Sequence, residues 1–293
     1  MKLAAIDIGS NAIRLQITKV LLQDDSQPVF KKLEYVRFPL RLGKDVFASG
    51  QIGEEKRGKF IKLMQAFKLL MDLHEVDHYM ACATSAMRES ANGKEVVQFV
   101  KNNVGVNIDI IDGDMEASMV NKAIRSFLTD ESYLHIDVGG GSTELNLYVG
   151  GDKLNSISFK MGSVRRLEHH DSPEVWNEME QWVKDNIKSK YGTITAIGTG
   201  GNINKIYDLA EEKGEKIVSL QSVKDTINIV KTYSYEDRVN IIRLNPDRAD
   251  VIVPASEIYI SVMEWAKADN IIVPDVGLKD GILLELYQTH STS

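Results

Sequence analysis

The sequence predicts a mixed α/β protein made of two similar lobes, and three observations lead to this prediction. Apolar stretches typical of buried strands alternate with stretches of helical periodicity. A strand that ends in aspartate and a glycine turn occurs near the N-terminus and again in mid-chain, where Asp137 lies 130 residues after Asp7. That interval has the size of a domain, not of a short structural repeat. The 293 residues are also enough for two moderate cores.

The first half begins with strands and continues as an alternation of strands and helices. Apolar runs and period-two alternation predict three strands, and residues 53–74 show the apolar spacing of a helix. Beyond that helix we expect two more strands and two more helices. In chain order, the remaining expected elements are strands 2–8, 13–20, 29–38, 79–83 and 106–111, and helices 94–104 and 115–127.

The second half repeats the opening hairpin and is then mainly helical. Gly150, Gly151 and Asp152 form a hairpin turn between two alternating segments. We expect one lobe over residues 1–125 and another over 126–293, with a C-terminal helix at about 281–293 packing back on the first lobe. A ligand would then bind in the cleft between the lobes. The expected elements are strands 133–138, 145–149, 154–159, 193–197 and 270–273, and helices 173–190, 202–212, 222–233 and 256–268.

Charge and composition exclude several classes of partner. The chain has 35 Lys and Arg against 42 Asp and Glu, so its net charge is −7 and no general positive field is available for nucleic acid or an acidic membrane. No window approaches the ~20 apolar residues of a membrane span. The single cysteine, Cys82, favours a reducing compartment, and we expect a cytoplasmic protein. A homodimer is compatible with these observations.

Three glycine-rich turns are the strongest chemical signal. Two of them follow the strand-end residues Asp7 and Asp137, and the third lies between strand 193–197 and the next helix. Small residues allow backbone N–H groups to approach anionic oxygens closely, so these turns are typical of phosphate and metal sites. Ordinary tight hairpins and loop-to-helix glycines are the alternative. Two copies at a domain-length interval favour the phosphate interpretation.

The motifs around these turns resemble those of a known family. The chain is similar to the exopolyphosphatase and guanosine pentaphosphate phosphohydrolase (Ppx/GppA) family, within the actin, sugar kinase and Hsp70 superfamily. The resemblance implies two RNase H-like (actin-like ATPase) lobes with mixed sheets flanked by helices and an interlobe cleft. It is carried, in the family's order, by Ala5–Asn11, Arg41–Gly43, Ala83–Arg88, Gly113–Ala117, Asp137–Leu145 and Gly277–Gly281.

The resemblance also assigns catalytic roles. It makes Glu116 the base that activates water and Arg88 a ligand of the transferring phosphate. The sequence agrees with the first role, because a turn at Asp112 places Glu116 in the first turn of a helix, where the helix dipole favours a carboxylate. A glutamate that merely begins a helix and a solvated arginine are the alternatives.

The same resemblance assigns a divalent ion to Asp137 and Glu144, with Asp7 as an outer-sphere partner. Mg²⁺ is expected and Mn²⁺ is possible, because Mg²⁺ usually takes one or two carboxylates plus water and phosphate oxygens. Strand-end acids that cap loops are the alternative. The expected phosphate-binding residues, besides Arg88, are Ser10, Asn11, Gly139, Gly140, Gly141, Ser142, Thr143, Gly198, Gly200 and Gly201.

Some positions depart from the family pattern. Met115, Ser118 and Lys279 replace a frequent Glu, Arg and Arg, which bears on substrate contacts near the base. The sequence stops at Ser293, before the extra helical domains of longer relatives, so we expect short polyphosphates or guanosine pentaphosphate as substrates. An ATP-dependent phosphotransferase or ATPase, and a non-catalytic polyphosphate or alarmone sensor, remain alternatives. Arg165 and Arg166 are expected at the cleft mouth or on a solvated face.

Overall fold

The computed structural model describes residues 1–22, 28–187 and 191–291. The chain divides into two compact units: unit 1 is Met1–Ala123 with Gly277–Ser293, and unit 2 is Ile124–Val276. Each unit contains one mixed sheet with helices packed against it, which confirms the predicted α/β fold. The sequence predicts a second lobe from residue 126 and a C-terminal helix that packs back on the first lobe, and residues 277–291 are part of unit 1.

The sheet of unit 1 has the strand order β3-β2-β1-β4-β5 among the described residues. β1 pairs antiparallel with β2 and parallel with β4, and β4 pairs parallel with β5. The carboxyl ends of three parallel strands therefore lie at one edge of the sheet, where α/β proteins place their ligand sites. The strands are β1 (Lys2–Ile8), β2 (Ile13–Leu21), β3 (Val29–Phe38), β4 (His78–Ala83) and β5 (Asp109–Ile110).

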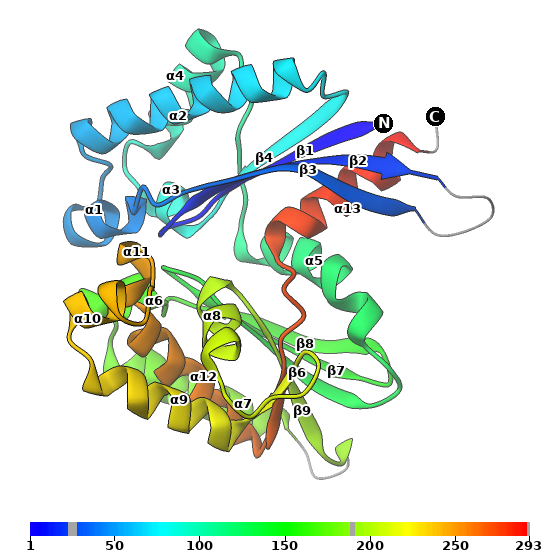
Figure 1. Cartoon of the computed structure of the whole chain (residues 1–293), viewed down its shortest axis with the longest axis vertical. Helices are drawn as coiled ribbons and strands as arrows, with labels where there is room; N and C mark the ends of the chain where they lie inside the picture. Colours follow the sequence, from blue (N-terminus) through cyan, green and yellow to red (C-terminus); the bar gives the residue numbers. More distant parts are fainter. Residues whose placement is uncertain (23–27, 188–190, 292–293) are drawn as a thin grey trace. The chain divides into compact units, whose positions relative to one another are not determined.

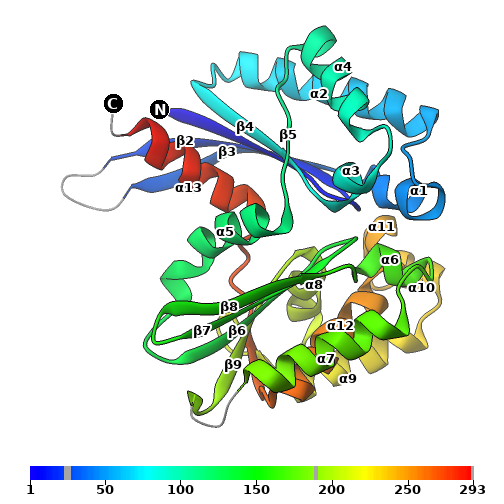
Figure 2. The same ribbon diagram turned by 180° about the vertical axis from the view of Figure 1, so that it is seen from behind.

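Helices cover both faces of this sheet. Figures 1 and 2 show α2 and α4 on one side and the red helix α13 on the other, where α13 contacts β1, β2 and β4. Phe60, Met64 and Phe67 of α2 are buried against the strands, as their helical spacing predicts. The helices of unit 1 are α1 (Leu42–Ser49), α2 (Glu54–Leu73), α3 (Ser85–Glu89), α4 (Gly93–Val104), α5 (Gly113–Ile124) and α13 (Leu278–His290).

The sheet of unit 2 has the order β10-β11-β9-β6-β7-β8 among the described residues. β6 pairs antiparallel with β7 and parallel with β9, which repeats the arrangement around β1 in unit 1. β6 and β9 thus end at the same edge and carry the second and third glycine turns there. The strands are β6 (Ser132–Val138), β7 (Thr143–Val149), β8 (Asp152–Phe159), β9 (Ile194–Thr199), β10 (Ile217–Ser219) and β11 (Asn270–Ile272).

The core of unit 2 is centred on α12. This helix contacts β6 and β9 and also α6, α7, α8 and α9, and its apolar residues join Leu134, Ile136, Leu145 and Leu147 in one buried cluster. A short 3₁₀ turn, η1 (Arg125–Phe127), opens the unit. The helices are α6 (Ser163–Leu167), α7 (Pro173–Asn186), α8 (Gly201–Leu209), α9 (Leu220–Thr232), α10 (Tyr235–Asn240), α11 (Pro246–Ala249) and α12 (Ile252–Ala266).

The elements that the sequence missed are mostly short. The helices α1, α3, α6, α10 and α11 have four to eight residues, which is too few to show a helical period. The expected strand 106–111 is shorter, since β5 covers two residues. Parts of two expected helices, residues 188–190 and 292–293, lie outside the described residues.

Candidate functional site

Three turns at one edge of unit 1 carry the expected catalytic residues. β1, β4 and β5 run parallel and end at this edge. The turn after β1 holds Ser10 and Asn11, and the helices α3 and α5 that follow β4 and β5 hold Arg88 and Glu116. These positions are distant in the chain, and the sheet order alone brings their turns to the same edge.

Asp7 is the penultimate residue of β1 and carries an ion pair. Its side chain is in register with Arg14 on β2, and Arg14 Nη1 donates to Asp7 Oδ2 at 2.7 Å. Asp7 is only 7% exposed, so this pairing offsets the cost of burying its charge. Asp7 is therefore a carboxylate that already holds a cationic partner inside unit 1.

The turn after Asp7 presents backbone amides on one side. The carbonyl oxygens of Ser10 and Asn11 accept hydrogen bonds from Gly43 N at 2.8 Å and Arg41 N at 2.9 Å. In a trans peptide the N–H points away from the preceding C=O, so the amides of Asn11 and Ala12 face away from the 41–43 segment. The hydroxyl oxygens of Ser10 and Ser85 share a hydrogen bond of 2.8 Å that links this turn to α3.

Arg88 connects the second turn to the third. It lies on α3, is partly buried, and its Nη1 donates to the carbonyl oxygen of Ile111 at 2.6 Å. Ile111 immediately precedes Asp112, the residue before α5. The guanidinium group is thus held beside the start of the helix that carries Glu116.

Glu116 lies in the first turn of α5, as the sequence predicts. Asp112 caps this helix, because its Oδ1 accepts from Met115 N at 2.8 Å. Burial raises the pKa of the Cys82 thiol to about 12, and the charges of Asp109, Asp7 and Glu116 add to the rise. Cys82 is the register partner of Asp7, so the thiol lies beside the strand end that carries Asp7.

Unit 2 places two acidic residues directly opposite one another. Asp137 on β6 and Glu144 on β7 are register partners, so their side chains leave the same face of the sheet. Glu144 is 3% exposed, and Ser158 Oγ on β8 donates to its Oε1 at 2.8 Å. Two facing carboxylates repel each other unless a cation lies near them.

This pair fits a hard divalent cation. Mg²⁺ binds through one or two carboxylates and keeps water and phosphate oxygens as its other ligands. Within residues 1–22, 28–187 and 191–291, no three His, Cys, Asp or Glu side chains gather as a complete protein cage. Two carboxylates are the number that Mg²⁺ takes from a protein when water and phosphate oxygens complete its coordination.

The loop after Asp137 forms an amide cradle. The carbonyl oxygens of Gly139, Gly140 and Gly141 accept, in turn, from Ser163 N, Val164 N and Arg165 Nε, each at 2.9 Å. The peptide geometry then turns the N–H groups that follow these carbonyls, those of Gly140, Gly141 and Ser142, to the opposite side. These three N–H groups, which we call the amide cradle, therefore face away from the 163–165 segment.

Gly162, the residue before α6, lets the chain pack closely against the cradle loop. A Cβ on Gly162 would lie 2.5 Å from the backbone carbonyl carbon of Gly140, which is too short for a contact between two carbon atoms. Thr143, expected as a phosphate ligand, instead donates its hydroxyl proton to Met161 O at 2.6 Å and supports the same loop. Arg165 is also part of this support and is 8% exposed, so it does not belong to a solvated face.

The third glycine loop reaches the acidic pair from β9. Gly200 has φ +109°, a conformation that side chains avoid, and a Cβ on it would lie 3.4 Å from Asp137 Oδ1. Tyr259 Oη donates to Thr199 O and accepts from Val138 N at 3.2 Å. Burial raises the pKa of Tyr259, and the charge of Asp137 adds to this, so the phenol keeps the proton it donates.

The sequence did not single out His135, which lies beneath the acidic pair. Its Nε2 and Thr199 Oγ1 are 2.8 Å apart, and Asn146 Nδ2 donates to its Nδ1 at 3.1 Å. Burial lowers the pKa of His135 to about 3, so the ring is neutral. His135 sits in an apolar run of β6 and gives no signal in the sequence, because its partners lie 64 and 11 positions away.

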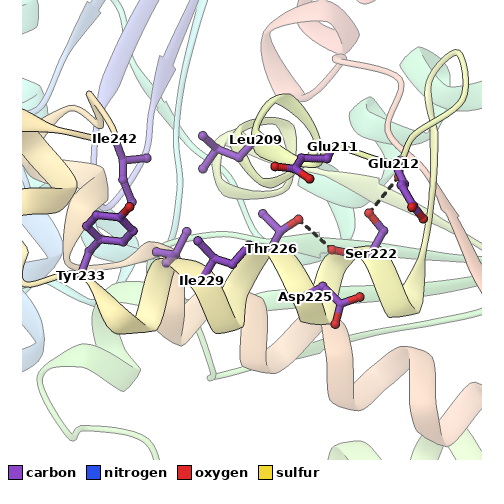
Figure 3. Close-up of a pocket in the computed structure, with 10 residues that line it drawn as sticks. Leu209, Glu211, Glu212, Ser222, Asp225, Thr226, Ile229, Tyr233 and Ile242 are labelled. Atoms are coloured by element: carbon purple, nitrogen blue, oxygen red, sulfur yellow. Dashed lines mark hydrogen bonds between the residues drawn. The ribbon is translucent and has the colours of Figure 1, made fainter.

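A separate cavity of about 290 Å³ lies along α9 in unit 2. Figure 3 shows Glu211, Glu212 and Asp225 at its margin, with Ile229 and Tyr233 further along the helix. Carboxylates at this margin repel a polyanion, so this cavity is not a phosphate site.

The described residues contain no helix both long and apolar enough to cross a bilayer.

Comparison with known proteins identifies the family. The model of the Ppx/GppA phosphatase family matches residues 20–290. The chain belongs to the Ppx/GppA phosphatase family. The resemblance predicted from the glycine-loop motifs is therefore confirmed, and it extends over nearly the whole chain.

Curated relatives of this Ppx/GppA chain include proteins of different lengths. A bifunctional 3-dehydroquinate synthase/phosphatase from Fusobacterium nucleatum is 29% identical, and the match covers 96% of this chain and 46% of that protein. Exopolyphosphatase 1 from Mycobacterium leprae is 20% identical over 97% and 89%. Guanosine-5'-triphosphate,3'-diphosphate pyrophosphatase from Photobacterium profundum is 22% identical over 97% and 59%. The chain thus spans about half the length of the first and third of these.

A solved structure shares the fold of this Ppx/GppA chain. The crystal structure of the Aquifex aeolicus family member superposes with a TM-score of 0.77 at 25% identity, and the match covers 100% of this chain and 99% of that one. The predicted two-lobe fold is confirmed by this likeness.

Proposed function

We propose that this chain is a phosphohydrolase that releases terminal phosphate from short inorganic polyphosphates or from guanosine pentaphosphate. The observation that carries the proposal is the facing pair Asp137 and Glu144 beside the amide cradle of residues 140–142. Two carboxylates for a cation and three amides for an anion are what a polyphosphate–metal complex requires. The names of the exopolyphosphatase and pyrophosphatase relatives support this substrate class.

Mg²⁺ is the proposed ion, with Mn²⁺ as a substitute, and Asp137 and Glu144 would hold it. When bound, a divalent ion supplies Lewis-acid stabilisation of the charge on the phosphate oxygens. Asp7 is left outside this ligand pair because Arg14 already neutralises it. The backbone amides of Gly140, Gly141 and Ser142, with those of the 198–201 loop, would bind the remaining oxygens.

Glu116 is the proposed base. It would accept a proton from a water molecule as the water oxygen bonds to the terminal phosphorus, and the bridging P–O bond breaks on the opposite side. The leaving phosphate chain keeps the bond's electron pair. Arg88 would contact the transferring group and offset its developing charge. The helix N-terminus of α5 favours the ionised form of Glu116, which is the form a base needs.

Phosphate release by wild type and Glu116→Gln tests the proposal. The substrates are polyphosphates of defined length, guanosine pentaphosphate and ATP, each with Mg²⁺. We expect the variant to lose about 10³-fold in rate, within the range of general-base catalysis. Asp114→Asn is the matched control, because this acid lies in the same helical turn and is exposed.

The panel also separates the rival functions. Equal rates for wild type and Glu116→Gln would overturn the assigned base. Preference for ATP only when an acceptor is present would indicate a phosphotransferase. Tight binding of polyphosphate or guanosine pentaphosphate without release of phosphate would indicate a sensor.

A further inference from the structure

A buried polar layer lies one step behind the acidic pair. His135 on β6 and Asn146 on β7 are register partners, as Asp137 and Glu144 are, and each lies two residues further from the sheet edge. Side chains two apart in a strand leave the same face, so both pairs share one face of the sheet. His135 and Asn146 are each 1% exposed.

His135 joins three strands through this layer. Its Nδ1 accepts from Asn146 on β7, and its Nε2 contacts the Thr199 hydroxyl on β9 at 2.8 Å. Thr199 is the register partner of Asp137 and is completely buried. The imidazole therefore holds the residue that lies beside Asp137, on the side opposite Glu144.

The donors in this layer have a fixed direction. An amide Nδ2 only donates, so Nδ1 of His135 accepts and the ring proton is on Nε2. With the ring proton on Nε2, His135 donates to Thr199 Oγ1, and the hydroxyl proton is left for another acceptor. Asp137 is the register partner of Thr199 on β6, so the two side chains leave the same face of the sheet.

Unit 1 has no histidine at the corresponding position. At the positions 130 residues earlier, Ala5 replaces His135 and Gln16 replaces Asn146, and these two are also register partners. Ala5 is fully buried and has no polar group. Burying a hydrogen-bonded histidine costs desolvation free energy that a buried alanine does not. The polar layer in unit 2 therefore suggests a role in holding the adjacent acidic pair.

We propose that His135 is a positioning residue for the cation site, setting the Thr199 hydroxyl and through it the carboxylate of Asp137. The proposal rests on the proposed function, since it takes Asp137 as a ligand of the divalent ion. Partners behind a ligand fix its orientation, and their loss typically weakens metal binding 10- to 100-fold.

Two amide substitutions separate the two ring contacts. The amide nitrogen of glutamine falls where Nε2 of histidine lies, whereas that of asparagine falls where Nδ1 lies. His135→Gln keeps the contact to Thr199, and His135→Asn loses it while staying polar. Thr199→Val removes the hydroxyl at nearly constant shape and tests the same link from the other side. Thr226→Val, in α9, removes a buried hydroxyl that donates to Ser222 O within its own helix.

The measurement is Mn²⁺ affinity of the substrate-free protein by electron paramagnetic resonance, together with kcat and KM for phosphate release. We expect His135→Asn and Thr199→Val to weaken Mn²⁺ binding at least tenfold, with His135→Gln within about threefold of wild type and Thr226→Val unchanged. Wild-type affinity in His135→Asn and Thr199→Val would overturn the proposal, as would equal weakening in His135→Asn and His135→Gln.

Asp137→Asn distinguishes failure of this inference from failure of the proposed site. If Asp137→Asn weakens Mn²⁺ binding and neither His135→Asn nor Thr199→Val does, only the role of His135 is wrong. If Asp137→Asn also binds Mn²⁺ like wild type, the cation site and the inference built on it are both wrong.

Discussion

The opening hairpins of the two units have the same register but differ in the charge of the residue opposite the buried aspartate. β1–β2 places Asp7 opposite Arg14, and β6–β7 places Asp137 opposite Glu144, each partner 130 residues after its counterpart. In unit 1 the buried aspartate is neutralised by a guanidinium 2.7 Å away. In unit 2 a second carboxylate occupies the guanidinium's place. The same hairpin register thus pairs a buried aspartate with a guanidinium in unit 1 and with a second acidic residue in unit 2.

The difference extends to the neighbouring strand. The register partner of Asp7 on β4 is Cys82, and that of Asp137 on β9 is Thr199. Cys82 offers a weak hydrogen-bonding group, whereas Thr199 is fixed by His135 and by Tyr259. We call an aspartate and its register partners on the two neighbouring strands a row. In the Asp137 row Thr199 is held by hydrogen bonds, whereas the Asp7 row contains the ion pair between Asp7 and Arg14.

Converting the second hairpin into the first should give the largest effect. Glu144→Arg places a cation opposite Asp137, as Arg14 does opposite Asp7, so the internal guanidinium competes with the divalent ion. Loss of the ion removes several kcal/mol of transition-state stabilisation, and we expect phosphate release to fall about 10³-fold or more. Release from polyphosphate at saturating Mg²⁺, with Mn²⁺ affinity measured alongside, checks this.

Glu211→Gln is the control for the loss of one acid in unit 2, because Glu211 is an exposed residue of the α9 cavity. It should retain wild-type turnover. Unchanged Mn²⁺ affinity in Glu144→Arg would contradict the assignment of this row to the cation.

Removing the guanidinium from the first hairpin should mainly reduce stability. Arg14→Ala leaves Asp7 buried without its ion-pair partner, and we expect a loss of about 2–3 kcal/mol in the free energy of unfolding, less than for a completely buried pair. Glu144→Gln in metal-free protein should change it by no more than about 1 kcal/mol, because it relieves a repulsion. Urea unfolding in the presence of a chelator measures both.

A surface pair calibrates the Arg14 result. Lys59→Ala removes an exposed i,i+4 pair with Glu55 and should cost about 0.5 kcal/mol or less. If Arg14→Ala costs no more than Lys59→Ala, the ion pair does not carry the charge of Asp7 in the way the comparison requires.

The sequence predicted the parts of this comparison that are local. The strand-end aspartates, the glycine turns and the position of Glu116 in a first helical turn all follow from neighbours within a few residues. The burial of Arg165 did not follow, because its five-residue helix α6 has no detectable period and its partner Gly141 lies 24 positions earlier. The same applies to His135, whose role depends on β9 lying beside β6.

Cys82, the register partner of Asp7 on β4, gives the smallest expected effect on stability, and only at alkaline pH. The Cys82 thiol has a pKa of about 12 in the fold, chiefly from burial, against about 9 for an ordinary thiol. Between these values the unfolded chain loses a proton that the folded chain keeps, so stability falls as pH rises above 9 and is unaffected below it. Cys82→Ala lacks this proton. Under reducing conditions, urea unfolding at pH 7.5, 9 and 10 should show wild type losing up to about 1.4 kcal/mol per pH unit more than the variant above pH 9. Parallel curves for the two proteins would mean that the thiol beside Asp7 and Glu116 ionises as readily in the fold as in the open chain.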